Sequence, residues 1–532
     1  MEGQKYNFFA ELCMNIVFDT AVITTKKLKL KNLKFYLLCI LTGVVTGMVT
    51  VPYRYLLVKS ATLREILFAH DVPVWRHLLS LAVMWLVGMF IYRIVKRYPM
   101  ISGSGIPQAE GAVNGRFSLK RPFKSLWAKF TGGLLGIGMG LSLGREGPSV
   151  QMGAYIAKLI AKWSRTGTAY QKYLITGGAS AGLSSAFTAP LASTIFVIEE
   201  VEKFDSAKIA ISSLLGGITS GWIAKEWITG NAYALIDTSF PERLEFISAI
   251  PVFLGFALLL SFIGKSFNWL TLKMQSGWIN SRINTAIKIL ALVTVTYIIG
   301  YFFSDLVAGG ESFLLNQALS VETGIVFLGG IIILKLLFTP FCYSAGFPGG
   351  IFLPLLVIGG LAGKWYTLLL ARWNIIDIHD FGFFMVIGMS ALFAAVVRSP
   401  ITGLILILEM TGKFSIFFPM IVVVGLTYFI SEILGVKPIY DSLYERLLPP
   451  DIRSSQERIT VPYEVGVNSY LDGKRLADIQ LPRYCQITSI VRKGKPMPLK
   501  ETKLHAGDSI EIELFSKDLE TLYRSFRSLA NE

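Results

Sequence analysis

The sequence predicts an all-α polytopic membrane protein, built as an inverted repeat of broken helices and followed by a small cytoplasmic α+β domain. Of its 532 residues, 53% are hydrophobic and only 16% are charged, and the mean hydropathy is +0.54. A soluble chain of this length would carry a larger share of charged residues. Apolar stretches recur along most of the chain, and Gly and Pro interrupt them in two places.

The net charge of +15 lies almost entirely in this hydrophobic part, because residues 451–532 hold 13 Lys and Arg against 12 Asp and Glu. Basic loops beside membrane spans follow from the positive-inside bias, which we favour over a nucleic-acid surface. The four cysteines are far apart and form no CxxC pair. We therefore expect neither a disulfide scaffold nor a metal site.

The N-terminal segment, residues 1–34, is expected to be an amphipathic helix on the cytoplasmic surface. Five lysines between Lys26 and Lys34 directly precede the apolar stretch 35–58, which places the N-terminus in the cytoplasm. Early acidic residues and the lack of a basic start argue against a cleavable signal peptide.

The membrane domain is expected to span residues 35–448, with two halves at about 35–226 and 248–435. After the first stretch, apolar segments follow at 75–95, 123–143, 148–163, 172–186, 190–200, 207–226, 248–275, 284–303, 322–341, 351–370, 381–398, 400–412 and 416–435. Several are shorter than the roughly 20 residues of a simple span. Broken helices persist in a bilayer only where protein or a cavity surrounds them. One such cluster in each half is typical of a transporter's substrate site.

The charge density rises after Pro450, which marks a linker at 449–458 and a soluble domain at 459–532. The apolar pattern and turn residues of this domain predict the elements in order. They are a strand at 459–463, a short helix at 471–479, a strand at 485–492, a strand at 509–515 after a Gly-Asp turn, and a helix at 516–529.

Three Gly- and Pro-rich motifs open apolar helices: GSGIP at 103–107, GREGP at 144–148 and GFPGGIFLP at 346–354. A helix start exposes N–H groups and the positive end of the helix dipole, which together suit an anion. Glycine lets the backbone approach the ion closely, and proline fits the first helical turn. Several such starts at mid-membrane would bind an anion without trapping it.

These motifs, in this order and followed by KPIY at 437–440, resemble the CLC family of chloride channels and chloride/proton antiporters over residues 35–448. The resemblance implies a homodimer with one pathway per subunit, in the plasma (inner) membrane of a prokaryote, with both termini cytoplasmic. It also implies that the Ser104 hydroxyl, the Tyr440 phenol and the backbone N–H groups of Ile351 and Phe352 bind chloride. In this family, serine in the GSGIP motif accompanies chloride selectivity.

Other motif residues are assigned to the anion path by the same resemblance: Gly103, Gly105, Arg145, Gly147 and Gly350. For Arg145, support of the outer entrance and a structural ion pair remain equally open. Ser104 as a helix cap and Tyr440 as an interfacial aromatic are the simpler alternatives.

Two glutamates, Glu146 and Glu200, carry the proton hypothesis. Glu146 begins a helix inside the membrane, where a carboxylate is costly unless functional. The resemblance assigns it as the external gate and proton carrier, and assigns Glu200 as the internal proton-transfer residue. Glu199 points about 100° away from Glu200 on a helix, so we expect it to be structural.

The leading function is therefore chloride/proton exchange. One alternative is a passive voltage- or ligand-gated chloride channel, against which Glu200 argues. The other is a membrane receptor whose transport path is vestigial. An enzyme is not expected, because the chain has four His, no HExxH, no Walker loop and no complete GxGxxG.

The tail is similar to the C-terminal RCK (TrkA-C) regulatory module of potassium-transport systems, through Leu471–Leu476, Leu481-Pro482 and Leu504–Asp508. Some modules of this class bind cyclic di-AMP at a dimer interface, which suggests Arg483, Ile487 and Pro496 as contacts. An unliganded dimerisation domain is the alternative.

Overall fold

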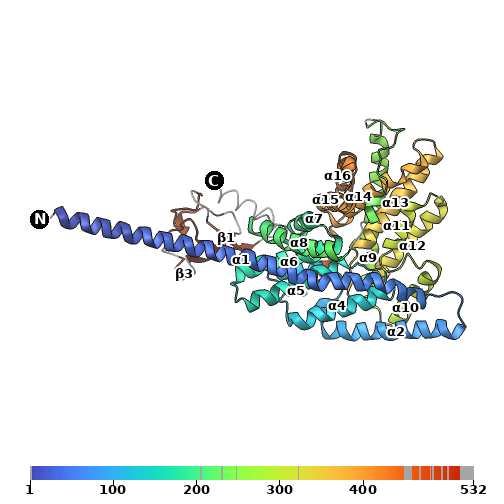
Figure 1. Ribbon diagram of the computed structural model, residues 1–532, viewed down its shortest axis with the longest axis horizontal. Helices are drawn as coiled ribbons and strands as arrows, with labels where there is room; N and C mark the ends of the chain where they lie inside the picture. The colour runs from blue at the N-terminus through green and yellow to red at the C-terminus, as the bar shows by residue number, and fades with distance from the viewer. Residues whose placement is uncertain are drawn as a thin grey trace. The chain divides into compact units, whose positions relative to one another are not determined.

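The computed structural model describes the backbone of residues 3–203, 207–228, 232–246, 248–321, 323–448, 458–465, 469–479, 481, 485–492, 495–499 and 502–515. Side chains of the first helix are described from Leu33 onwards. The chain divides into two compact units, Met1–Tyr444 and Glu445–Glu532. Figure 1 colours the chain by residue number from blue to red. Most of the expected linker, 449–457, and the expected C-terminal helix lie outside the described residues.

The first unit is helical, and its α-helices follow the order α1 Gly3–Leu67, α2 Val74–Arg97, α3 Ile106–Val113, α4 Pro122–Gly138, α5 Glu146–Trp163, α6 Thr168–Phe187, α7 Pro190–Phe196, α8 Ala207–Trp227, α9 Ile250–Asn280, α10 Thr285–Phe302, α11 Glu311–Leu319, α12 Ile325–Ser344, α13 Phe352–Arg372, α14 Phe381–Val397, α15 Pro400–Thr411, α16 Phe417–Ile433 and α17 Ile439–Leu447. Most expected apolar segments match one of these helices within a few residues. The short helices α11 and α17 were not predicted, and α3 was expected only as the helix that GSGIP opens.

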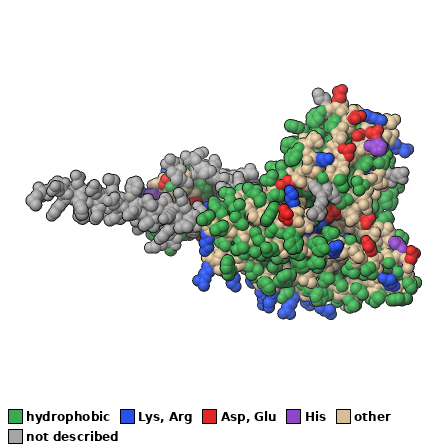
Figure 2. Space-filling model, in the orientation of Figure 1, with side chains coloured by type: hydrophobic (Ala, Val, Ile, Leu, Met, Phe, Trp, Pro, Cys, Tyr) green, Lys and Arg blue, Asp and Glu red, His purple; other side chains and the backbone are tan. Residues whose placement is uncertain are grey.

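Eight helices of the described chain are long and apolar enough to cross a membrane. Hydrophobic side chains cover much of this unit on the face that Figure 2 shows. The first helix differs from expectation, because α1 runs without a break from Gly3 to Leu67 (Figure 1). No helix end separates the N-terminal segment from the first span.

The packing of the second half repeats that of the first. Helix α5 packs on α6 as α13 packs on α14, and α1 packs on α8 as α9 packs on α16. Glycines allow the close approach of α5 to α6 and of α13 to α14. A Cβ on Gly153 would lie 1.9 Å from the Gly178 carbonyl oxygen, and one on Gly359 would lie 2.3 Å from that of Gly388. The expected internal repeat is therefore present in the helix packing.

Two glutamates show that the halves face each other. Glu199 accepts hydrogen bonds from the backbone N–H of Thr402 at 2.8 Å and Ile401 at 3.3 Å, at the start of α15. Glu409, on α15, accepts them from Ala192 at 2.7 Å and Leu191 at 3.1 Å, at the start of α7. Each half thus caps the other's short helix, as a two-fold relation requires, and the structural interpretation of Glu199 is confirmed.

The second unit contains a four-stranded antiparallel sheet in the order β1-β4-β2-β3. Its strands are β1 Arg458–Glu464, β2 Cys485–Arg492, β3 Lys495–Met497 and β4 Ser509–Phe515. The helix expected at 471–479 is wrong, because only a 3₁₀ turn, η6 Leu476–Asp478, forms there. Gly473 has a positive φ of 81°, and Arg475 pairs with Lys503 in a β-bridge, so the backbone cannot continue as a helix.

Candidate functional site

Backbone hydrogen bonds join the three Gly-rich motifs. Gly144 and Gly350 exchange N–H···O bonds of 2.6 and 2.7 Å as an isolated antiparallel bridge. Gly103 accepts from the Gly349 N–H at 3.1 Å and donates to Gly346 at 3.3 Å. Since each motif opens a helix, these bonds bring the starts of α3, α5 and α13 to one place.

The glycines of these motifs are needed for close contact. Gly103 and Gly105 have positive φ angles of 65° and 100°, which favour glycine. A Cβ on Gly147 would lie 2.4 Å from the Ser104 hydroxyl oxygen, and one on Gly350 would lie 3.3 Å from the Gly147 nitrogen. Larger residues would force the helix starts apart.

The four residues expected to bind chloride are all buried. Neither the Ser104 nor the Tyr440 hydroxyl has a hydrogen-bond partner among the described residues, although the two lie within interaction range of each other. Ile351 is the N-cap of α13 and Phe352 its first residue, so their N–H groups have no acceptor within the helix. Unpartnered buried donors are costly, and these are the donors an anion needs.

Both simpler alternatives for the hydroxyl residues disagree with this geometry. The N-cap of α3 is Gly105, and no side chain caps that helix, so Ser104 is not a helix cap. Tyr440 has 0% exposure at the start of α17 and is not an interfacial aromatic. Its phenol interacts electrostatically with both Glu146 and Glu200, which places it near both candidate proton carriers.

Glu146 is the first residue of α5 and is fully buried. Its Oε2 lies 2.3 Å from the position that a Cβ on Gly144 would take, and the Leu353 nitrogen lies 3.2 Å from that position. The carboxylate therefore occupies the space between the starts of α5 and α13. An ionised carboxylate there fills the place where two helix dipoles would otherwise attract an anion.

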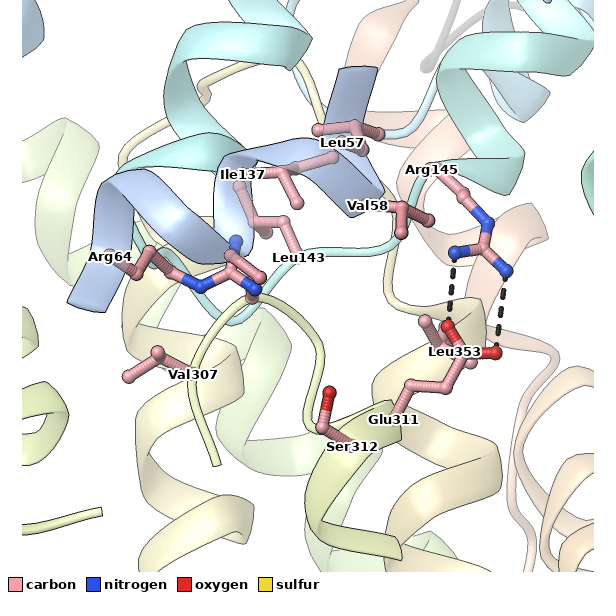
Figure 3. A pocket seen from close by; sticks show the side chains of 12 residues that line it. Leu57, Val58, Arg64, Ile137, Leu143, Arg145, Val307, Glu311, Ser312 and Leu353 are labelled. Carbon is pink, nitrogen blue, oxygen red and sulfur yellow. Dashed lines mark hydrogen bonds and ion pairs between the residues drawn. The ribbon is translucent and has the colours of Figure 1, made fainter. Parts of the chain in front are cut away.

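Arg145 forms the ion pair that was one of its two alternatives. Its guanidinium bonds both oxygens of Glu311, at 3.0 and 3.4 Å, and Tyr233 donates to Glu311 at 3.0 Å. Figure 3 shows this pair at one side of a cavity, and the Arg145 Nε also lies 3.9 Å from a carboxylate oxygen of Glu146, so Arg145 connects the cavity wall to Glu146. Sequence analysis missed Glu311, although the pair Gly309-Gly310 before it is a helix-start signal of the same kind as GSGIP.

Two buried lysines, also missed, support the motif loops. Lys129 donates to the carbonyl oxygens of Ile101 at 2.9 Å and Gly103 at 2.7 Å. Lys335 donates to the Leu306 carbonyl at 2.7 Å and the Ser142 hydroxyl at 2.9 Å. The sequence feature that could have identified them is a lysine inside an apolar helix, because charged residues within a membrane are rare and usually functional.

Glu200 lies in a π-helical turn, η2 Val197–Glu202, and is 3% exposed. It accepts a 2.8 Å hydrogen bond from the Ser399 hydroxyl. Its other carboxylate oxygen has no partner in the described part of the chain. Nearby, Lys203 binds Glu110 and Asp441, and this charged cluster interacts electrostatically with Glu200. Buried π-turns are frequent at functional sites.

The two described tail residues proposed as nucleotide contacts, Ile487 and Pro496, differ in exposure. Ile487 is 5% exposed and belongs to the core of the sheet, so its assignment as a surface contact is wrong for the single chain. Pro496 is exposed on β3, and Arg483 lies outside the described residues. In the same unit, Arg492 binds Asp508 through two hydrogen bonds of 2.7 and 2.8 Å.

Comparison with known proteins assigns both parts of the chain. Residues 87–432 match the family described as voltage gated chloride channel, and 461–527 match the TrkA-C domain. A curated relative named H(+)/Cl(-) exchange transporter ClcA, from Cronobacter sakazakii, is 32% identical over 434 residues, covering 78% of this chain and 90% of the relative. The protein of that name from Yersinia pestis is 31% identical, with coverages of 79% and 88%.

Solved structures agree in fold. A slow cyanobacterial Cl⁻/H⁺ antiporter is 29% identical with a TM-score of 0.70, covering 77% of this chain and 97% of that one. A eukaryotic CLC transporter is 19% identical with a TM-score of 0.67, covering 80% of this chain and 78% of that one. At this identity it supports the fold alone. The expected fold class is therefore confirmed, and the chain belongs to the voltage-gated chloride channel (CLC) family.

Proposed function

We propose that this protein exchanges chloride for protons across a membrane. The observation that carries the proposal is the buried Glu146 carboxylate between the starts of α5 and α13. An acid at that point competes with chloride when ionised and carries a proton when neutral, so one group couples the two ions. The names of the ClcA relatives and of the cyanobacterial antiporter support the same activity.

Chloride would bind through neutral donors. The hydroxyls of Ser104 and Tyr440 and the N–H groups of Ile351 and Phe352 supply four donors in a water-poor site. No donor in this set carries a full positive charge, which keeps binding favourable but reversible. The two buried lysines are not part of this donor set, because their N–H groups are committed to loop carbonyl oxygens and, for Lys335, also to the Ser142 hydroxyl.

Protons would move between Glu146 and Glu200. The free oxygen of Glu200 is available to take up a proton, while Ser399 holds the other oxygen in place. The cluster of Lys203, Glu110 and Asp441 joins η2 to α3 and α17 and is the polar environment from which Glu200 would receive protons. Glu200 is thus the feature that favours exchange over a passive channel.

Proton movement in liposomes tests the function. Purified protein is reconstituted, a chloride gradient is imposed, and external pH is followed. Uphill proton movement driven by chloride alone is the expected result. Chloride flux without proton movement would make the protein a channel instead, and absence of any anion flux would favour the receptor alternative.

The protein is proposed to form a homodimer through α7, α8, α15 and α16. Large apolar side chains on these helices are exposed in the single chain: Leu191, Ile218, Trp222, Ile401, Phe418 and Phe429. Because lipid would also cover them, cysteine cross-linking at Trp222 in the bilayer distinguishes a partner subunit from lipid.

Both termini are proposed to lie in the cytoplasm of a prokaryote, with the membrane unit in its plasma membrane. Residues 116–124 hold four basic residues and no acidic one, whereas 237–245 hold three acidic and one basic residue. Lys and Arg side chains also gather along the left and lower border in Figure 2. The positive-inside bias puts 116–124 on the cytoplasmic side, which accessibility labelling of single cysteines checks.

The tail is proposed to regulate transport, with cyclic di-AMP as its ligand. The TrkA-C match supports a regulatory role, and exposed Pro496 offers an apolar surface against which an adenine can stack. Calorimetric titration of the full-length protein with cyclic di-AMP tests this, and no heat at micromolar ligand would leave the tail as an unliganded dimerisation domain.

A further inference from the structure

A cavity of about 140 Å³ lies directly beside the gate (Figure 3). Leu143 and Arg145, which line it, flank the bridged Gly144, and Leu353, which also lines it, follows the chloride-binding pair of α13. The Leu353 nitrogen and the Glu146 carboxylate approach the same point near Gly144. Only one layer of residues therefore separates the cavity from the gate carboxylate.

The charges in this cavity are not balanced. Arg145 is neutralised by Glu311, whereas Arg64, on the opposite side in Figure 3, directs its guanidinium toward the space. Arg64 donates to the neutral Ser60 hydroxyl at 2.8 Å, and no carboxylate of the described residues forms an ion pair with it. Most of the remaining wall is aliphatic. The charged lining residues Arg64, Arg145 and Glu311 together carry a net charge of +1. Asp305 and Glu65, outside the lining, also interact electrostatically with Arg64, but the wall itself is left with an excess of positive charge in largely aliphatic surroundings, which attracts an anion.

Neutral donors complete the same wall. Ser312 lines the cavity as the second residue of α11, a helix of nine residues that begins after Gly310 at a φ of 88°. The first N–H groups of a helix have no acceptor within it and carry the positive end of its dipole. A guanidinium, a hydroxyl and a helix start therefore border one space.

The cavity is large enough for a hydrated halide, because a single water needs only about 10 to 15 Å³ of such space and the cavity offers about 140 Å³. Because Arg145 already binds Glu311, Arg64 is the lining cation for which no ion pair forms within the described residues.

We propose that this cavity is a loading site, in which Arg64 holds a partly hydrated chloride before the ion reaches the path closed by Glu146. This inference rests on the proposed exchange of chloride and on the outward orientation of the Glu146 side. The site raises the local chloride concentration beside the gate, so exchange saturates at a lower chloride concentration on that side than on the other.

The test uses full-length protein in liposomes, with chloride varied on one side at a time and the exchange rate followed. Arg64→Gln is expected to raise the chloride KM on the cavity side about tenfold, the effect of losing one charge-assisted contact, with the KM on the opposite side unchanged. Arg64→Lys, which keeps the charge, is expected to stay within about twofold of wild type. Lys59→Gln removes an exposed charge from the same helix outside the cavity and serves as the matched control.

Two failures are distinguishable. If the wild type shows no chloride-driven proton movement, the proposed function fails; if it exchanges ions but Arg64→Gln keeps the wild-type KM on both sides, the loading site is wrong. Should Arg64→Gln not fold, Ser312→Cys gives a measurement independent of transport. Its modification by an anionic thiol reagent is expected to be faster than by a cationic one and to be slowed by chloride, and no protection by chloride would overturn the proposal.

Discussion

The two halves of the membrane unit share the residues that build the repeat but differ at the positions that carry protons. Lys129 and Lys335 each precede their bridged glycine by 15 residues, and both donate to loop carbonyl oxygens. Two residues after that glycine, the first half has Glu146 and the second has Phe352. The scaffold is therefore symmetric while the ionisable chemistry is one-sided.

Glu200, the second candidate proton carrier, is likewise present in only one of the two halves. Glu199 and Glu409 occupy matching positions because each caps the other half's short helix. The residue after Glu199 is Glu200, but the residue after Glu409 is Met410. A repeat supplies two equivalent sets of helix starts, and a proton path needs acids along one route only. Substitutions of structural residues that occur in both halves should thus have similar effects on stability. Substitutions of the acids, which occur in one half only, should instead change proton transport.

The largest effect is expected for Glu146→Gln. A neutral amide neither competes with chloride as an anion nor releases a proton, so proton transport should fall to background while chloride flux continues. Parallel recordings of chloride and pH in liposomes measure both. Glu226→Gln, at an exposed acid, is the control, and retained coupling in Glu146→Gln would refute the one-sided assignment.

Glu200→Gln is expected to reduce proton transport by more than about tenfold, in the range for removal of a positioned proton-transfer group. The amide can still accept the Ser399 hydrogen bond, so folding should be preserved. The thermal midpoint of the purified protein checks that point alongside the coupling ratio. Normal coupling with a normal midpoint would place the internal proton route elsewhere.

Gly153→Ala and Gly359→Ala should destabilise the two halves equally. Each new methyl group would meet a carbonyl oxygen of the facing helix, at 1.9 and 2.3 Å, which costs about 2 to 3 kcal/mol if the helices shift apart. Thermal unfolding in detergent measures the loss. Gly330→Ala, on α12 with open space around it, should instead be neutral or slightly stabilising, and a large difference between the paired variants would break the symmetry argument.

Removing either capping carboxylate has a smaller expected effect. Glu199→Ala and Glu409→Ala leave two helix-start N–H groups without acceptors, at about 1 to 2 kcal/mol each. Both variants should lower the thermal midpoint by similar amounts and keep the proton-to-chloride ratio. Loss of coupling in Glu199→Ala at an unchanged midpoint would show that this residue belongs to the proton route instead.

Much of this architecture could be predicted from the sequence, because hydrophobic runs mark spans. The segment expected at 75–95 is α2 at Val74–Arg97, and the motif glycines lie where close contact requires them. Helix α11 was missed because its nine residues begin with polar side chains and carry no long apolar run. The partners of Arg145 and Glu199 are more than 150 residues away, and only the fold brings such residues together.

The tail shows most clearly what could not be predicted from the sequence. The strand 485–492 was predicted correctly, yet Ile487 was expected at a ligand surface and lies in the core. Alternation along a strand predicts two faces but not which one is covered. The prediction of a helix at 471–479 was wrong because it relied on a short apolar pattern, whereas a glycine with positive φ and a β-bridge determine the backbone there.

The tail lies outside the repeat, so a variant there tests the stability of the tail itself and not the symmetry of the membrane unit. Arg492 hydrogen-bonds Asp508 and holds the pKa of that carboxyl below its usual value. A lowered pKa means that the stabilisation is complete above the unfolded value, about 3.9, and is lost as pH falls through the folded value. Asp508→Asn should therefore lower the free energy of unfolding of the tail by about 1 to 2 kcal/mol at neutral pH, and the difference from wild type should shrink below about pH 4. Hydrogen exchange of strand β4 in the full-length protein measures both, and a difference that persists in acid would mean that the bond, not the charge, supplies the stability.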